Sequence, residues 1–396
     1  MLSRPSPGMI VVLCLFCVLF LGVADNQVLS PLLPAIRRQF AGTTREMSFL
    51  FTGYSLCAGL SVLIWGPVSD FFGRRRCLMI GLGIFMLGSI GAFLSRDFRS
   101  LLLARIITGM GASMLSLNTI SYAADFFPYA QRGWAMGSIF SSYFAALILG
   151  VPIGSWIGEK LGWHSVFAMA GVSSFLLVVS ARFALPRMPP HRSTAQAEFA
   201  VMEEIRTFLG FLQKRHTVGA LLSSFCASAG TAGFLAFLGV WLHDAFNISG
   251  QKVGLVFLVS GAAALVASPL AGSLSDRIGK RTQFAISNVA LALLLVVLPH
   301  LFWGPSLFGV FCAISLAAAF RQGPMEALLT EVVSPASRGS FIALKNSFSQ
   351  LGIALAALLS GMAFESVGYN AVCWIGACAN VAAAVSILFL VKGTRL

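Results

Sequence analysis

Long apolar runs separated by short polar loops occupy almost the whole chain. A run of about 20 apolar residues is long enough to cross the roughly 30 Å of hydrocarbon in a membrane. The pattern therefore predicts twelve membrane-spanning helices, at residues 9–35, 47–71, 77–95, 99–124, 133–158, 164–186, 217–243, 252–275, 282–301, 305–331, 340–364 and 369–391. The first run is too long for the core of a signal peptide and lacks a convincing small-x-small cleavage site, so we expect it to remain as the first helix.

One polar segment, between the sixth and seventh spans, is much longer than the other loops. It runs from Arg187 to His216, contains a Pro-Pro pair and then mixes acidic and basic residues. We predict a linker that includes an amphipathic helix on the membrane surface. The linker, residues 187–216, joins a first bundle at residues 1–186 to a second at residues 217–396.

Two loop motifs occur once in each half of the chain. The ten residues from Gly66 to Arg75 reappear, 206 positions later, as Gly272 to Arg281. At the same offset, the segment from Asp125 to Gly133 corresponds to the segment from Glu331 to Gly339. The repeat predicts an all-α membrane protein in which twelve transmembrane helices form two pseudo-symmetric six-helix bundles, a plan typical of transporters.

Composition and charge agree with a membrane protein. Hydrophobic residues make up 57% of the chain and charged residues only 10%, whereas a soluble domain has about 25% charged residues. The net charge of +13 does not indicate nucleic-acid binding, because the basic residues lie in short loops and form no continuous stripe. Most of these loop residues lie on one side, which places both termini in the cytoplasm of a multi-pass protein of the inner (plasma) membrane.

The sequence shows no sign of an enzyme or a metalloprotein. Its eight cysteines fall singly inside apolar segments, without the spacing of metal ligands. We find no nucleophile triad, no P-loop and no nucleotide-binding motif. We therefore expect no enzymatic activity, no metal and no cofactor.

Four segments resemble the signatures of one family. Gly66 to Arg75 resembles its loop between helices 2 and 3, and the segment from Arg105 to Ala112 resembles its Arg-x-x-Gln-Gly-x-Gly-Ala motif with Thr in place of Gln. The segment Gly150-Val-Pro152-Ile-Gly154 resembles its antiporter motif. Gly22 to Pro34 resembles its first-helix pattern.

The family is the major facilitator superfamily, and the chain is most similar to its twelve-helix drug and metabolite efflux branch. The resemblance implies a secondary active transporter, a proton antiporter that exports a small organic compound such as a drug, sugar or other metabolite by alternating access. Its partners would be the small-molecule substrate, protons and membrane lipids, and we expect a monomer. The resemblance does not give the substrate.

Asp25 and Arg105 are candidates for proton coupling. Asp25 lies nine residues before Pro34 and Arg105 eight residues after Asp97, so both lie about 12–13 Å from the same membrane surface. Because neither charge is tolerated against lipid, we expect the two to face the bundle interior and pair. The pair is either a proton switch or a static structural ion pair. Asn26 and Gln27 extend the polar patch and are candidate substrate contacts.

Arg321 lies near the middle of the predicted tenth helix, at a position that the repeat gives as Leu115 in the first half. A midplane arginine is a candidate for binding an anionic or polar group of the substrate. Glu326, five residues on, is a candidate partner for Arg321 or a second protonation site. The alternative is that the two only pair with neighbouring groups. Further candidates for the lining of the substrate cavity are Asn118, Tyr143, Asn346 and Gln350.

The repeated loops are candidates for a gate at the cytoplasmic side. We expect Asp70 and Asp276 to pair with basic residues of a neighbouring segment when this side is closed, with Arg132 and Arg338 as plausible partners. The other residues assigned to gating are Gly73, Arg74, Gly279 and Lys280 in the two turns, and Gly150, Pro152 and Gly154 in the fifth span. Small residues at this spacing also permit close helix packing.

Two other functions remain open. A lipid or lysolipid transporter of the same fold would need an apolar cavity with one or two polar anchors, which Asp25 and Arg321 could supply. A proton-coupled importer would use the same parts in the other direction. A receptor is less consistent with the sequence, since the chain has no large segment outside its apolar runs.

Overall fold

The computed structural model describes residues 7–188, 197–334 and 337–391, and helices account for nearly all of this part of the chain. Twelve helices, or pairs of continuous helices, are long and apolar enough to cross a membrane, as the sequence predicts. The elements are α1 (Pro7–Gln39), α2 (Thr44–Phe72), α3 (Arg74–Leu94), α4 (Phe98–Phe126), α5 (Tyr129–Ala145), a π turn (Ala146–Gly150), α6 (Val151–Leu161), α7 (Trp163–Ala184), α8 (Ala197–Leu212), α9 (Arg215–Phe246), α10 (Gly250–Ile278), α11 (Lys280–Val297), a 3₁₀ turn (Leu298–His300), α12 (Pro305–Val332), α13 (Arg338–Val367) and α14 (Tyr369–Leu390).

The ends of the helices follow local capping chemistry. At the start of α2, Thr43 and Glu46 form a reciprocal capping box that satisfies free backbone N–H groups. The turns after α2 and α10 depend on Gly73 (φ 86°) and Gly279 (φ 87°), a conformation that favours glycine. The tight turns expected from the repeated motif are therefore present in both halves.

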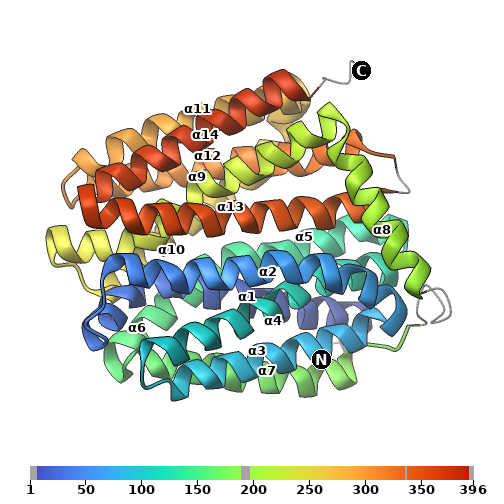
Figure 1. Ribbon diagram of the computed structural model, residues 1–396, viewed down its shortest axis with the longest axis horizontal. Helices are drawn as coiled ribbons and strands as arrows, with labels where there is room; N and C mark the ends of the chain where they lie inside the picture. The colour runs from blue at the N-terminus through green and yellow to red at the C-terminus, as the bar shows by residue number, and fades with distance from the viewer. Residues whose placement is uncertain (1–6, 189–196, 335–336, 392–396) are drawn as a thin grey trace, which may run out of the picture.

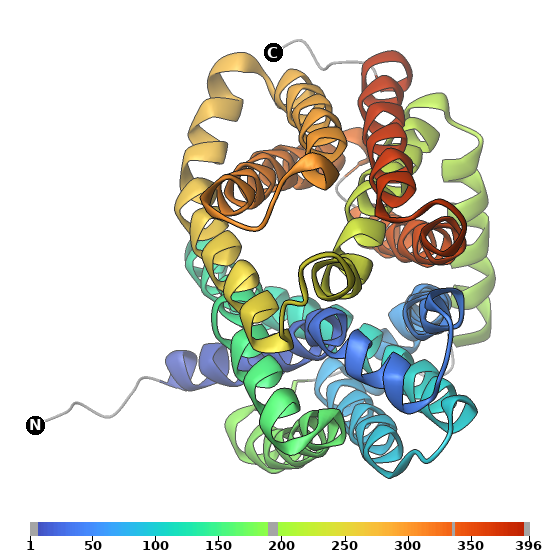
Figure 2. The ribbon, with the colours of Figure 1, turned by 90° about the vertical axis from the view of Figure 1, so that its left-hand side faces the viewer.

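The helices form two groups that lie side by side, α1–α7 and α9–α14 (Figures 1 and 2). The amphipathic helix expected in the linker is α8, which crosses one end of the bundle and contacts α2, α9 and α13. The Pro-Pro pair of the linker lies outside the described residues. We call the end that carries α8 the linker end and the opposite end the far end.

Two long seams join the groups, and α1 also packs closely against α9, where a Cβ added to Gly239 would lie 2.2 Å from the backbone oxygen of Ser30. One runs between α2 and α13, and the other runs between α10 and the fifth span, which consists of α5, the π turn and α6. Glycines allow close approach at both seams: a Cβ atom added to Gly361 would lie 2.4 Å from Cβ of Ser48, and one added to Gly254 would lie 3.0 Å from Cα of Pro152. The helices therefore meet nearly backbone to backbone.

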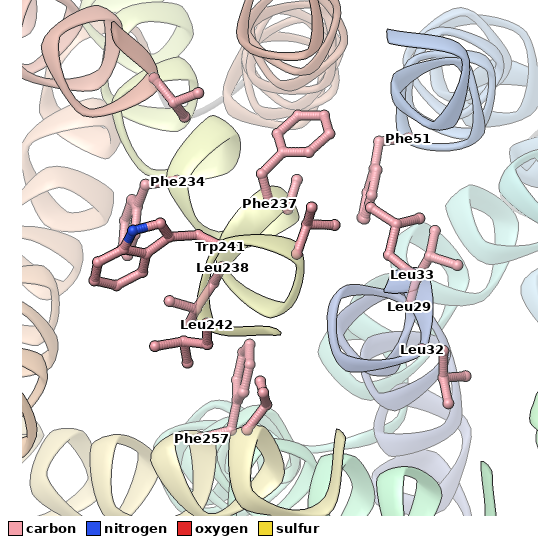
Figure 3. Packing of buried hydrophobic residues seen from close by; sticks show 14 of the residues in the cluster. Leu29, Leu32, Leu33, Phe51, Phe234, Phe237, Leu238, Trp241, Leu242 and Phe257 are labelled. Atoms are coloured by element: carbon pink, nitrogen blue, oxygen red, sulfur yellow. The ribbon is translucent and has the colours of Figure 1, made fainter. Parts of the chain in front are cut away.

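Within the described residues, the buried apolar cluster with members from both groups lies at the far end; elsewhere only the partly buried Leu63 and Phe144 pack against a cluster of the other group. At the far end, Leu33 and Phe51 of the first group belong to the same buried cluster as Phe237 and Trp241 of the second (Figure 3). At the linker end, one cluster contains residues of the first group alone. The other contains buried residues of the second group and takes only the partly buried Leu63 from the first. The halves are thus sealed at the far end and more separate at the linker end.

Candidate functional site

A buried ion pair links α1 and α4. Nη1 of Arg105 lies 2.6 Å from Oδ2 of Asp25, and these side chains are only 0% and 1% exposed. The guanidinium also lies over the rings of Tyr54, at 4.6 Å, and Phe167, at 5.7 Å. The contact expected from equal depth is confirmed, whereas the two aromatic neighbours were not predicted.

This ion pair is held by one hydrogen bond. Oδ1 of Asp25, and Nε and Nη2 of Arg105, are buried and have no hydrogen-bond partner in the described part of the chain. Cation–π contact with Tyr54 and Phe167 offsets part of the cost of burying the arginine. A buried pair whose polar atoms are incompletely satisfied contributes little net stability. It is therefore easier to rearrange than a bidentate pair would be.

A second polar group connects the two halves. The hydroxyl of Tyr143, on α5, interacts with the side chain of Gln27, on α1, and electrostatically with Arg321 on α12. Tyr143 is nevertheless 43% exposed. An exposed tyrosine between residues of both halves indicates that solvent reaches this region. Asn26 is half-buried beside Gln27 on α1.

Arg321 is buried, at 7% exposure, and it is held by groups that carry no formal charge. Its Nη1 donates to the carbonyl oxygen of Ala227, at 2.8 Å, and to Oδ1 of Asn380, at 3.2 Å. Asn380 in turn donates to the carbonyl oxygens of Gly230, at 3.0 Å, and Gly376, at 2.8 Å. Sequence reasoning missed Asn380, although an asparagine inside an apolar run was a usable signal.

The candidate pairing of Arg321 with Glu326 is wrong. Oε1 of Glu326 accepts from Nζ of Lys345, at 2.7 Å, on α13, and from Nε2 of Gln322, at 3.3 Å. At about 100° per residue, five positions along a helix turn a side chain about 140° away. Glu326 therefore faces α13, whereas Arg321 faces α9 and α14.

The other candidate lining residues are spread through the bundle. Asn118 is fully buried and donates to the carbonyl oxygen of Met114 on its own helix, at 2.8 Å. Gln350 is half-buried, and its Cβ would lie 3.0 Å from a Cβ added to Gly59, which places it at the seam between α2 and α13. Asn346 is half-buried on α13. Of the four expected lining residues, Gln350 lies at a seam between the halves, and Tyr143 interacts electrostatically with Arg321 of the other half.

The loop motif of the first half forms an ion-pair network at the linker end. Arg74 pairs with Asp70 in the same motif and hydrogen-bonds Ser69. Its Nε also lies 3.4 Å from Oδ2 of Asp125, at the end of α4. The expectation that Arg132 pairs with Asp70 is wrong, because Arg132 donates to the carbonyl oxygen of Phe127, at 3.0 Å. Arg74, which lies in the same turn as Asp70, reaches the Asp70 carboxylate more easily than Arg132 does.

The corresponding network in the second half is only partly described. The side chain of Asp276 lies outside the described residues, so its pairing stays a prediction. The same holds for the gating roles of Lys280 and Arg338.

The glycines of the fifth span pack against α1. Cβ atoms added to Gly150 and Gly154 would lie 2.7 Å from Cβ of Ala24 and 2.5 Å from Cγ2 of Val28. On its other side, the span contacts α10 at Pro152. The π turn that ends at Gly150 was not predicted. One extra residue per turn rotates the following glycines relative to Tyr143.

Polar contacts also join the halves at the far end. Nη2 of Arg37 lies 2.6 Å from Oδ1 of Asp244, and Glu159 accepts from the backbone N–H of Gln251, at 2.9 Å. Nearby, a cavity of about 310 Å³ lies between α1, α6, α9 and α10. These pairings could not be predicted from the sequence, because the residues are far apart along the chain.

Twelve apolar helices in two repeated groups, with ionisable residues buried at membrane depth, define a multi-pass membrane protein of the transporter class. The chain belongs to the Major Facilitator Superfamily, whose family model matches residues 15–240 and 220–395. It is accordingly a transporter of small molecules and not an enzyme.

Relatives cover most of the chain. An MFS-type transporter of Bacillus subtilis (strain 168), YwfA, is 27% identical over 376 residues, which are 94% of this chain and 90% of that protein. The riboflavin transporter RibZ of Clostridioides difficile (strain 630) is 25% identical over 336 residues, 72% of this chain and 73% of that protein. The crystal structure of a D-xylose-proton symporter has a TM-score of 0.77 at 19% identity and covers 97% of this chain and 98% of that chain.

Proposed function

We propose that this protein is a proton-coupled transporter that exports a small organic compound by alternating access. The observation that carries the proposal is the buried pair of Asp25 and Arg105, which joins two helices of the first half through one hydrogen bond. An ionisable pair at membrane depth is costly to keep and is typical of proton relays.

The charge of the loops and the packing of the core support a state of the transport cycle in which the protein is open toward the cytoplasm. The positive-inside rule favours the linker end as the cytoplasmic one, because most loop Lys and Arg residues lie there. With the far end sealed by a shared apolar cluster, the protein then faces the cytoplasm. Solvent would reach Tyr143 and Gln27 from that side.

Protonation of Asp25 would change the contact between α1 and α4. Oδ1 of Asp25 has no partner in the described structure, so a proton can add there before the bond from Arg105 to Oδ2 breaks. The neutral carboxyl holds the guanidinium less tightly, because the Coulomb attraction between two opposite charges is lost. Gln27, two residues further along α1, would then carry the change to Tyr143.

The test follows the conformation and needs no known substrate. Spin labels at Arg45 and Phe302, exposed residues at the far ends of the two halves, report the opening of that end by pulsed electron resonance in a chain whose native cysteines are replaced. We expect the distances to change with pH in the parent protein, and to stay fixed in Asp25→Asn. Glu365→Gln removes an exposed carboxylate of α13 and should behave as the parent does. A parent-like pH response in Asp25→Asn would contradict the proposal.

Import is the second candidate, because a structure of the same fold is titled a D-xylose-proton symporter. The helix-5 motif favours export, and the sign of the coupling separates the two. Riboflavin and D-xylose, named in the relatives' titles, are the first ligands to examine in proteoliposomes. If the protein is a proton-coupled exporter, its ligand should bind more tightly as pH rises. If it is a symporter, the ligand should bind more weakly as pH rises.

A further inference from the structure

Arg321 is the one basic side chain in the middle of the membrane-spanning part of the described chain that has no carboxylate partner. At this depth, Arg105 pairs with Asp25 and Lys345 pairs with Glu326. The two described contacts of Arg321 are to a backbone carbonyl and an amide oxygen. An isolated charge in such a place is expensive unless an opposite charge or water meets it.

The free edge of the guanidinium is the one that binds oxyanions. The two hydrogens of Nη1 point to Ala227 and Asn380, and the remaining three donors are on Nε and Nη2. Neither nitrogen is hydrogen-bonded within the described residues, and neither is among the fully enclosed polar atoms without a partner. An edge with two parallel N–H groups fits a carboxylate or a phosphate in bidentate fashion.

Polar groups that interact with one another in the region of Arg321 come from both halves. Tyr143 interacts electrostatically with Arg321 and also interacts with Gln27, and it is partly exposed. A compound bound at Arg321 would therefore meet a hydroxyl and an amide of the first half. Such a compound would contact both halves, as a transported molecule must.

Asn380 holds Arg321 in place. Its amide nitrogen is fixed by two backbone carbonyls, of Gly230 and Gly376, so its oxygen points at Nη1. A side chain on Gly230 would collide with it, since an added Cβ would lie 2.5 Å from Nδ2 of Asn380. This support leaves the other edge of the arginine free.

We propose that the transported compound is an organic anion whose carboxylate or phosphate group is bound by Nε and Nη2 of Arg321, with Tyr143 and Gln27 contacting its polar body. The inference rests on the proposed function, since it names the substrate class of the same transporter. The bound anion supplies the negative charge that the described residues around Arg321 lack.

The test compares acids with neutral analogues by thermal shift on the purified full-length protein. The probes are benzoate with benzamide, glucuronate with glucose, and glucose 6-phosphate with glucose, at constant ionic strength. We expect at least one acid to raise the melting temperature of the parent protein while its neutral analogue does not. In Arg321→Gln, the concentration needed should rise about tenfold to a hundredfold, as for a lost charge-assisted hydrogen bond.

Two further variants distinguish a loss of acid binding from misfolding of Arg321→Gln. Tyr143→Phe removes only a hydroxyl from a partly exposed side chain and should weaken acid binding severalfold, whereas Glu365→Gln should leave it unchanged. The inference is overturned if no acid shifts the parent more than it shifts Arg321→Gln and Tyr143→Phe, or if the neutral analogues stabilise as well as the acids. Binding needs no proton gradient, so this result is independent of the pH response of Asp25→Asn.

Discussion

The apolar contact at the far end should hold the two halves closed more strongly than the ion pair beside it. Phe51, on α2, is 7% exposed and lies against Phe237 of α9, with ring centroids 6.3 Å apart. A buried phenylalanine covers about 150–250 Å². If a third to a half of this area faces the other half, opening exposes about 50–125 Å², which costs about 1–3 kcal/mol at ~25 cal/mol per Å².

The ion pair of Arg37 and Asp244 contributes less. Its side chains are 23% and 38% exposed, so solvent screens the charges, and exposed pairs contribute only about 0.2–1 kcal/mol. Phe51→Ala should therefore shift the equilibrium toward the state open at the far end by about tenfold or more. Asp244→Asn should shift it by about fivefold at most.

The spin labels at Arg45 and Phe302 measure both shifts as changes in the population of the long distance, at a pH where both states are present. Phe93→Ala serves as the control, because Phe93 is 42% exposed near the end of α3. It should leave the populations unchanged. A larger shift in Asp244→Asn than in Phe51→Ala would refute the argument from area.

Four other changes should have defined effects. Gly154→Leu should lower the melting temperature, since overpacking against Val28 costs about 1–3 kcal/mol, whereas Gly137→Leu, where an added Cβ meets nothing within 4 Å, should not. Arg74→Gln should raise the protease sensitivity of the linker end, because Asp70 and Asp125 lose their shared partner; unchanged digestion would contradict this. Asp97 caps α4, and the hydrogen bond from the backbone N–H of Ser100 lowers its pKa from 3.8. The stabilisation of the parent over Asp97→Ala is therefore present above pH 3.8 and should disappear as pH falls below it; a difference that persisted in acid would argue against the cap. Asn380→Ala should weaken acid binding without changing the pH response of the spin-label distances, and equal loss of both would make Asn380 merely structural.

The fold could be predicted from the sequence because its signals are local. Runs of apolar residues give the spans, and the repeat gives the two halves. The pairing of Asp25 with Arg105 could also be predicted, since the depth of a residue along each helix can be counted from the end of that helix. The helices extend a few residues beyond the predicted spans, as with α1 (Pro7–Gln39), because charged and polar residues continue the helix past the apolar run.

The rotation of the helices about their axes could not be predicted from the sequence. Choosing Glu326 as a partner for Arg321 failed for this reason. The roles of Asn380 and of the pair formed by Arg37 and Asp244 depend on contacts between residues 59 and 207 positions apart. The π turn that ends at Gly150 interrupts an otherwise regular helix without a sequence signal of its own.

The glycine seams have a consequence for the speed of the transport cycle. Where Gly361 meets Ser48 and Gly254 meets Pro152, no long side chains interlock across the boundary between the halves. Helices that meet along such smooth surfaces can roll past each other without first withdrawing side chains from opposing pockets. The energy barrier between the two open states is then set mainly by the far-end contacts. Bulkier residues at the seams would therefore change how fast the halves exchange before they change which state is preferred.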